Sequence, residues 1–479
     1  MTALNPILTV KGYSILKAGL TKVQEAQILT ELLVAPKTLP KFSKGVQSFR
    51  LYLESAARYY VPKAWGLRVF GPPEGNTVPP GIPLPDAVRF KGSPYPYQQT
   101  IIDSFVSQGA NGLICVPCGR GKTFMALAIA VRLGARVLIV VDKEFLMNQW
   151  KDEIARYVDF ARVGIVQGPK AETDPALYDI TICMIQTICL RDWVPGTFDG
   201  YGFTIFDECH HLGAQHFSGV LKKIQTAKML GLSATPDRDD GLTKVFEYYL
   251  GKPVYQEKTR DPDPTVMVRA VWFRSEDPAY TEPPRDWKGE LVTARLLTQL
   301  VECEPRTGLV LEHLKELAAD PRRKILVLSE RKAHLAALEA GLPPGTVRGY
   351  YVGGMKQVDL DTNASTCQVL LATYAMASEA MNIKALNAMI MASPRKKVEQ
   401  STGRILRTSV DARTVEPLIV DIIDSHDMYV NQWYQRQRYY KKCAYTIEHV
   451  GKPGKTAREV EEAQNVVLAS QCMITLTKS

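Results

Sequence analysis

Short apolar runs alternate with helical patterns over most of the chain after residue 97. Strand-like runs occur at 112–116, 136–141, 180–184, 203–206 and 229–232. Segments 123–133 and 144–158 instead repeat apolar residues at helical spacing. The alternation is interrupted over 261–285, a segment rich in Pro, Asp and Glu. Further strand-like runs follow at 324–328, 368–372, 388–392 and 418–422. This alternation is typical of βαβ units, so we expect an α/β fold with two tandem parallel-sheet domains.

The first 90 residues lack this strand–helix alternation and predict a small accessory module. Helical spacing is present over 21–33 and again over 46–60. A dense series of prolines and glycines between 62 and 96 excludes helix and predicts a linker. The predicted division is an N-terminal accessory module (1–90), a first α/β domain (91–262), a second α/β domain (263–445) and a C-terminal tail (446–479).

Charge adds information about partners. The formal net charge is +9, and residues 1–90 alone hold 11 Lys and Arg against 5 Asp and Glu. A basic surface favours phosphate-rich partners, although a merely soluble basic protein would have the same balance. The overall composition, with 46% hydrophobic and 23% charged residues, excludes wholesale disorder and a membrane bundle. Without a signal peptide, a long apolar span or a disulfide framework, we expect a soluble intracellular protein with no membrane partner; nucleus, cytoplasm and virion stay open.

A phosphate-binding loop is predicted between the first strand and the first helix of the α/β region. Its residues are Pro117, Cys118, Gly119, Arg120, Gly121, Lys122 and Thr123. Glycines let backbone N–H groups approach a phosphate, a Lys reaches the outer phosphates, and a Thr hydroxyl can bind Mg²⁺. The first glycine of the full pattern is replaced by Val116. The alternative is a chance glycine turn, which the strand–loop–helix context disfavours.

A second acidic motif follows the strand at 203–206. Asp207 and Glu208 end that strand and are followed by a Cys and a His. In a nucleotide-hydrolysing sheet, Asp207 would hold Mg²⁺ through water and Glu208 would polarise the attacking water. Alone, two solvated acids that cap a strand would be the simpler interpretation. The preceding phosphate loop favours the catalytic one.

In order and spacing, several motifs resemble those of superfamily 2 DEAD/DEAH-like helicases over about 97–407. They are the Asp-Glu-Cys-His motif, Ser233-Ala-Thr235, and the segment from Gln400 to Arg407. Three further features resemble the XPB-like and UvsW-like DNA helicases and the transcript-release helicases of large DNA viruses: Pro96-Tyr-Gln98, Arg238-Asp-Asp240, and 373–384. Tyr95 departs from that group, which usually has Arg there.

The resemblance implies two RecA-like domains that use ATP and Mg²⁺. It assigns adenine recognition to Gln98 and arginine fingers to Arg404 and Arg407, with Gln400 ordering the site. It also implies that Ser233, Ala234 and Thr235 couple the acidic motif to the second domain. Thr123 and Asp207 are the expected Mg²⁺ ligands. For the arginines, the alternative is a solvated basic helix face.

Loops that follow the strands are expected to bind a nucleic acid backbone with little sequence preference. The candidates are Lys143, Gln186, Thr187, Arg331 and Thr373, each of which could equally be an ordinary surface residue. The basic and aromatic segment 433–442 could stack bases or pack on the second domain, and packing is the favoured interpretation.

We expect an ATP-dependent DNA helicase or translocase, moving 3′ to 5′ as its relatives do, on single-stranded, forked or branched DNA. An RNA helicase, or a duplex translocase that does not unwind, is the alternative, and RNA or an RNA–DNA hybrid stays a possible substrate. A transcription or replication protein could be a partner. A degenerate scaffold is disfavoured because Lys122, Asp207, Glu208, Arg404 and Arg407 are all present.

Overall fold

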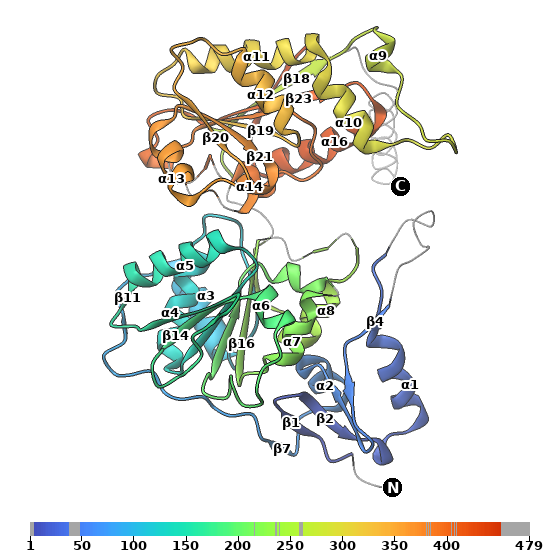
Figure 1. Cartoon of the computed structure of the whole chain (residues 1–479), viewed down its shortest axis with the longest axis vertical. Helices are drawn as coiled ribbons and strands as arrows, with labels where there is room; N and C mark the ends of the chain where they lie inside the picture. The colour runs from blue at the N-terminus through green and yellow to red at the C-terminus, as the bar shows by residue number, and fades with distance from the viewer. Residues whose placement is uncertain are drawn as a thin grey trace, which may run out of the picture. The chain divides into compact units, whose positions relative to one another are not determined.

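The structure is a computed structural model of the whole chain (Figure 1). It describes residues 4–451 except for 38–47, 215, 235–236, 239, 258–261, 380, 382, 384, 404, 407 and 409, and the side chains of 217, 378–379, 400 and 411. The chain forms two compact units, residues 1–260 and 261–479. In the described ranges, no helix is long and apolar enough to cross a membrane.

A mostly parallel eight-stranded sheet forms the centre of the first unit. Its order is β13-β12-β14-β10-β15-β16-β9-β17, and only the β12–β13 pair is antiparallel. The strands are β9 (Asn111–Cys115), β10 (Val137–Val141), β12 (Val163–Gln167), β13 (Lys170–Ala171), β14 (Ile180–Met184), β15 (Phe203–Phe206), β16 (Lys228–Ser233) and β17 (Pro253–Gln256). β8 (Arg89–Phe90) and β11 (Val158–Asp159) pair separately.

Helices cover both faces of this sheet (Figure 1), which explains why its strands have continuous apolar runs. One face packs against α3 (Pro96–Ser107), α4 (Lys122–Leu133) and α5 (Glu144–Tyr157). The other packs against α7 (Val220–Lys223), α8 (Thr243–Leu250) and the 3-10 helix η3 (Cys209–Gly213), with α6 (Ile185–Leu190) beside them. The predicted α/β architecture of this region is confirmed.

The N-terminal module packs onto the α8 side of the first unit. Its elements are β1 (Ile7–Thr9), β2 (Gly12–Leu16), α1 (Lys22–Glu31), β3 (Leu33–Val34), β4 (Phe49–Arg50), β5 (Leu53–Glu54), β6 (Arg58–Val61), α2 (Lys63–Phe70) and β7 (Gly75–Asn76). Lys63 Nζ donates to Asn111 Oδ1 at 2.9 Å and to the Ala227 carbonyl at 2.8 Å, and burial lowers its pKa to about 8. The module and the first sheet share one hydrophobic cluster, so they form a single compact unit.

Two expectations for this module are wrong. The described part of 46–60 forms strands, because Tyr59 and Val61 alternate inward with Tyr60 between them on a sheet pleat. The proline- and glycine-rich segment after 62 contains a helix, α2, which starts directly after Pro62. Position 66 inside α2 is a glycine because a Cβ there would lie 2.4 Å from the Tyr13 ring.

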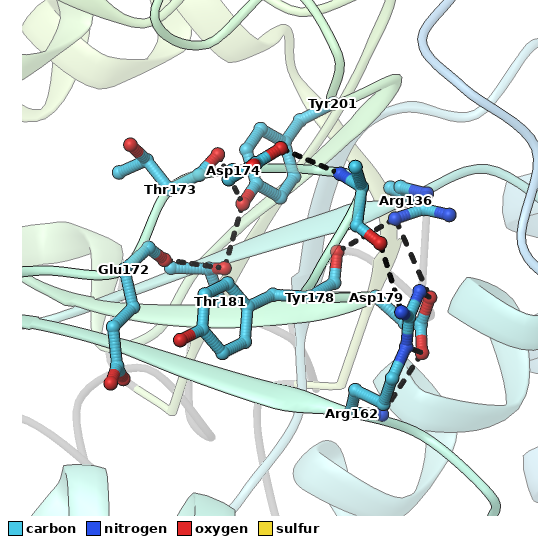
Figure 2. A network of polar contacts seen from close by, with 10 residues as sticks. Arg136, Arg162, Glu172, Thr173, Asp174, Tyr178, Asp179, Thr181 and Tyr201 are labelled. Carbon is cyan, nitrogen blue, oxygen red and sulfur yellow. Dashed lines mark hydrogen bonds and ion pairs between the residues drawn. The ribbon is translucent and has the colours of Figure 1, made fainter.

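A polar network closes the amino-terminal edge of the first sheet (Figure 2). The buried Asp179 accepts three hydrogen bonds from Arg162 and forms an ion pair with Arg136 at 3.5 Å. Although burial opposes ionisation, these arginines lower the pKa of Asp179. Thr181 Oγ1 and the Tyr201 hydroxyl share a hydrogen bond of 2.7 Å beside them. This network joins strand starts, so it lies opposite the carboxyl edge that carries the motifs.

The second unit contains a parallel seven-stranded sheet with the order β20-β21-β19-β22-β23-β18-β24. Its strands are β18 (Met267–Phe273), β19 (Ile325–Ser329), β20 (Arg348–Tyr351), β21 (Val369–Thr373), β22 (Ala388–Met391), β23 (Leu418–Asp424) and β24 (Thr446–Val450). The helices are α9 (Pro278–Thr281), α10 (Thr293–Glu302), α11 (Glu304–Ala318), α12 (Lys332–Ala340), α13 (Gln357–Thr366), α14 (Tyr374–Glu379), α15 (Glu399–Thr402) and α16 (Asp427–Lys442). The second predicted parallel sheet is therefore confirmed.

Three strands of this sheet, β18, β20 and β24, lie where the sequence predicted none. The segment 261–285, where the alternation is interrupted, contains β18, which pairs with both β23 and β24. β24 lies in the segment that the sequence division assigned to the C-terminal tail. The favoured interpretation of 433–442 is confirmed, since Trp433 and Tyr440 of α16 are buried and Arg436 forms a buried ion pair with Asp421.

A buried histidine makes the second unit sensitive to acid. Burial, and then the charge of Arg306, lower the pKa of His334 to about 3. The unfolded chain protonates this residue near pH 6.5, so below that pH unfolding is favoured by about 1.4 kcal/mol per pH unit. We expect the unfolding free energy of this unit to fall by about 1 kcal/mol between pH 6.5 and 5.5, because the unfolded histidine is half protonated at pH 6.5 and mostly protonated at pH 5.5. His334→Asn, measured by urea unfolding at both pH values, should remove this part of the slope; an unchanged slope would contradict the prediction.

Candidate functional site

The predicted motifs of the first unit meet at one edge of its sheet. The register pairs Cys115 with Ser233 and Phe206 with Gly231, so β9, β15 and β16 end side by side. Parallel strands place all their carboxyl ends at one edge, and ligands bind at that edge in open α/β sheets. The phosphate loop, the acidic pair and Ser233 therefore lie together.

The phosphate loop has the backbone shape that its glycines permit. Gly119 has a φ of 86°, and Gly121 adopts the left-handed conformation directly before α4. A Cβ on Gly121 would also lie 2.5 Å from Gln98 Nε2. Gln98 in turn donates to the Arg120 carbonyl at 3.1 Å and accepts from the Tyr95 amide at 3.0 Å. The predicted nucleotide residue Gln98 thus supports the loop.

Aromatic rings and an arginine surround this side of the loop. Tyr95 stacks on Tyr97 with ring centroids 6.0 Å apart, and the Arg120 guanidinium lies 4.9 Å from the Tyr97 centroid. Arg120 also forms an ion pair with Glu257, the last described residue before the second unit. Arg120 therefore places a cation beside the residues for which the sequence predicted adenine contacts, although Tyr95 replaces the usual arginine.

Lys122 and the acidic pair form the electrostatic centre of the site. Lys122 Nζ lies 4.0 Å from Glu208 Oε1, and both side chains are largely buried. Asp207 accepts from Trp150 Nε1 at 2.8 Å and from the Glu208 amide at 3.0 Å. Burial, and then the Glu208 charge, raise the pKa of Asp207. Although burial opposes it, the charges of Lys122 and His210 lower the pKa of Glu208.

Two adjacent buried carboxyl groups with a single lysine fit a site for an additional cation. Glu208 Oε2 is buried and faces His210 Nδ1 at 3.3 Å, and its neighbour Asp207 is the predicted Mg²⁺ residue. Within the described ranges, no three His, Cys, Asp or Glu side chains form a metal cluster. Mg²⁺ usually binds through one or two carboxylates together with substrate phosphates. Asp207 and the Thr123 hydroxyl are therefore suited to hold it together with a nucleotide.

The acidic motif is connected to the next strand through His210. Its Nδ1 lies 3.1 Å from Ser233 Oγ and 3.3 Å from Glu208 Oε2. The His210 carbonyl accepts from Arg238 Nη1 at 2.5 Å, and Arg238 is paired with Asp240. His210 therefore links Glu208 to Ser233 and to the Arg238–Asp240 pair, which precedes α8. Ala234, for which the resemblance implies a coupling role, follows β16 directly, and Thr235 lies outside the described residues.

The nucleic acid candidates of the first unit follow β10 and β14. Lys143 is the N-cap of α5, and Gln186 donates to the Asp142 carbonyl at 2.7 Å. The Thr187 hydroxyl accepts from the Gly168 amide at 2.9 Å. A hollow of about 540 Å³ lies here, lined by Gly168, Pro169, Gln186, Thr187, Leu190 and Arg191. Polar groups thus border a concave surface at the predicted edge.

The candidates of the second unit share one sheet edge as well. The register pairs Ser329 with Thr373, and Arg331 follows Ser329 by two residues. However, the Arg331 guanidinium is bound to α10, since it donates to Thr298 Oγ1 at 3.3 Å and to the Ala294 carbonyl at 3.1 Å. Its nucleic acid contact stays a prediction. Arg404, Arg407 and the side chain of Gln400 lie outside the described residues.

Sequence reasoning missed Trp150 and Asp142. Trp150 lies on α5, 57 residues before the carboxylate that it contacts, and no local pattern marks it. Asp142 ends β10 and lies 3.5 Å from His211 Nε2. A polar residue at the end of a fully buried strand was the available signal for Asp142.

Comparisons with known proteins agree with this site. A family model described as the res subunit of type III restriction enzymes matches residues 91–238. A protein of Acanthamoeba polyphaga mimivirus, named a candidate ATP-dependent RNA helicase, is 30% identical over 460 residues, which cover 91% of this chain and 85% of that protein.

Two further relatives span less of the chain. A candidate ATP-dependent RNA helicase of African swine fever virus is 28% identical over 382 residues, covering 73% of each chain. An XPB-type DNA 3′–5′ translocase of Sulfurisphaera tokodaii is 32% identical over 165 residues, covering 34% of this chain and 36% of that protein. With the phosphate loop and acidic pair at one sheet edge, these similarities show that the chain belongs to the superfamily 2 helicases, as an ATP-dependent enzyme close to the viral and XPB-like members.

Proposed function

We propose that this helicase is a DNA motor that uses ATP hydrolysis to move 3′ to 5′ and to unwind or remodel forked, branched or transcription-linked duplexes. The observation that carries the ATPase part is the Lys122–Glu208 pair beside Asp207 at the end of β15. An intact lysine and acidic pair favour turnover over a scaffold role.

In this proposal the residues of the first unit bind and orient the nucleotide. The loop amides and Lys122 hold the phosphates, while Gln98 supports the adenine end. Glu208, kept ionised by Lys122 and His210, orients the attacking water. Thr123 and Asp207 would hold Mg²⁺, which would supply charge neutralisation at the phosphates. Gln400, Arg404 and Arg407 stay proposed contributors from the second unit, where planar guanidinium groups suit phosphate oxygens.

We propose that the His210–Ser233 contact transmits the effect of ATP hydrolysis from Glu208 to the end of β16. His210 touches both the proposed water-positioning carboxylate and the end of β16, at 3.3 Å and 3.1 Å. Loss of the γ-phosphate changes the charge next to Glu208, so this contact is suited to transmit the change toward Ala234 and Thr235. Lys143, Gln186, Thr187, Arg331 and Thr373 are proposed to follow the nucleic acid backbone.

The choice of DNA is supported by the similarity to the XPB-type DNA translocase and by the Arg238-Asp-Asp240 element, which resembles that of such enzymes. The second candidate is an RNA helicase, because the two viral relatives that cover most of the chain are named for RNA.

The ATPase rate with Mg²⁺ tests the proposal directly. It is measured alone and with single-stranded, duplex and forked DNA, single-stranded RNA and an RNA–DNA hybrid. We expect forked and single-stranded DNA to stimulate the rate most. Duplexes with either a 3′ or a 5′ single-stranded tail then test direction, and the 3′-tailed substrate should be unwound.

Three results would change this conclusion. Equal or greater stimulation by RNA would replace the DNA motor with the RNA helicase. Stimulation by blunt duplex DNA without strand displacement would leave a translocase that does not unwind. No turnover with any of these nucleic acids would contradict the proposed motor.

A further inference from the structure

A narrow hairpin projects from the second unit between α9 and α10 (Figure 1). We define it as residues 284–292. Its two arms meet in a bridge between Arg285 and Leu291, and its tip carries Trp287 and Lys288. Neither the nucleotide site nor the strand-end loops account for it.

The hairpin is built to hold one shape. The Asp286 amide donates to the Glu290 carbonyl at 2.8 Å, and Asp286 Oδ1 accepts from the Lys288 and Glu290 amides at 2.9 Å each. Arg285 Nη1 donates to the Gly289 carbonyl at 2.8 Å. Gly289 has a φ of 78°, which supplies the left-handed residue that a tight hairpin turn favours. The tip is therefore organised before any ligand binds.

This fixed turn presents an indole ring to solvent. Trp287 is 88% exposed, whereas the other five tryptophans, all within the described residues, are buried or half-buried. Lys288 Nζ lies 4.6 Å from the ring centroid, so a cation covers one face of the indole. The remaining surface of the ring is available for a flat partner. A single exposed apolar residue can be incidental, but here it stands on a turn whose backbone is held by dedicated hydrogen bonds.

The base of the hairpin lies near the carboxyl edge of the second sheet. Leu296 and Leu300 of α10 pack with Phe273, the last residue of β18. Arg331, which follows β19, is bound to α10 through Thr298. A hollow of about 610 Å³ between α9 and α10 is lined by residues that include Pro284 of the hairpin. The hairpin is thus rigidly attached to the edge at which the nucleic acid candidates lie.

We propose that Trp287 stacks on an unpaired base of the nucleic acid strand that this helicase moves along, with Lys288 beside it. The inference rests on the proposed function, because it requires a nucleic acid at this edge. Every base offers a π-face, so stacking on an indole binds a strand without selecting its sequence. It would hold a separated strand against reannealing.

The charge of the hairpin disfavours a phosphate as the partner, and its narrow shape disfavours a protein. A base is the partner that fits both features. Residues 285–290 contain two cations and two anions, so the hairpin has no net attraction for a phosphate backbone. A protein interface would need a contiguous core around the anchor residue. Trp287 instead stands on a narrow tip next to polar residues.

Tryptophan fluorescence tests the contact directly. Acrylamide, a neutral quencher that phosphates do not repel, should quench mainly Trp287 in the free protein. Saturating single-stranded DNA of mixed sequence should protect this component, and a blunt duplex should not. Trp287→Phe should remove the quenchable component before DNA is added. Unchanged quenching in the presence of DNA that does stimulate the ATPase would overturn the inference and leave the proposed function standing.

Binding of the variants supplies the second measurement. Trp287→Ala should weaken single-strand binding by about tenfold, with the same slope of log K against log salt, because no phosphate contact is lost. Trp287→Phe should retain most of the affinity. Val358→Ala, a 74% exposed position on α13, is the matched control and should bind normally. A changed salt slope, or equal affinity for Trp287→Ala and the unmodified chain, would contradict stacking. Absence of any nucleic acid binding would contradict the proposed function and this inference together.

Discussion

Lys122→Ala is expected to reduce ATP turnover by at least about 10³-fold, while nucleic acid binding stays close to normal. Lys122 starts α4 and brings the cation that lies 4.0 Å from Glu208. Without it, the phosphate charge that develops during transfer loses its fixed counter-charge. The acidic pair also loses a charge that lowers the pKa of Glu208. The measurement is the steady-state ATPase rate with the most stimulating nucleic acid.

A matched control separates the site from general effects of charge. Lys151→Ala removes an exposed lysine from α5, on the same unit but away from the phosphate loop. It should keep its turnover and its nucleic acid affinity. Normal ATPase activity in Lys122→Ala would contradict the phosphate-site assignment. Equal loss of nucleic acid binding and of turnover would instead indicate a folding defect.

Five parallel strands of the first unit, β9, β10, β14, β15 and β16, could be predicted because helices cover both faces of the sheet, whereas β12 and β17 were missed. β10, β14 and β15 are apolar at every position or nearly so, and such runs are visible without any knowledge of the fold. β18 escaped notice because its neighbours are rich in Pro, Asp and Glu and because Arg269 interrupts its apolar run. The arginine is tolerated there since it pairs with Glu316 on α11.

In the candidate site too, some residues could be predicted from the sequence and others could not. The phosphate loop, Asp207 and Ser233 are local motifs, and the order of parallel strands brings them to one edge. The contacts that hold the motifs come from distant segments. Trp150 reaches Asp207 from α5, and Arg238 reaches the His210 carbonyl across 28 residues. Such contacts depend on how helices pack on the sheet, which short motifs do not encode.

Arg331 illustrates why strand-end residues are harder to interpret than glycine loops. Its position after β19 predicted a nucleic acid contact, yet in the structure its guanidinium is held by Thr298 of α10. An arginine at a strand end can bind a phosphate or fix a neighbouring helix, and both uses need the same donors. A glycine with positive φ next to a helix start has fewer alternatives, which made the phosphate loop the more informative signal.

Arg306→Met is expected to lower the unfolding free energy of the second unit by about 3–5 kcal/mol, the range for removing one partner of a buried ion pair. Arg306 and Asp424 are fully buried and share two hydrogen bonds, of 2.6 Å and 2.8 Å. In the variant, the Tyr280 hydroxyl at 3.1 Å would still donate to Asp424, but the Ala392 carbonyl would lose its hydrogen bond from Arg306. Urea unfolding, followed by hydrogen exchange of β23 amides, measures the transition of this unit.

The double variant Arg306→Met with Asp424→Asn tests the cause of the lost stability. It separates the loss of the ion pair itself from the cost of leaving the Asp424 carboxylate buried and unpaired. Because the second change removes the buried carboxylate charge, it should recover part of the stability that the single change loses. Arg322→Met is the exposed control: Arg322 pairs with Asp320 at 2.9 Å but is 72% exposed, so its loss should cost far less stability than the loss of Arg306. A single variant no less stable than this control would contradict the prediction. A double variant less stable than Arg306→Met alone would show that Asp424 stabilises β23 through contacts other than its arginine.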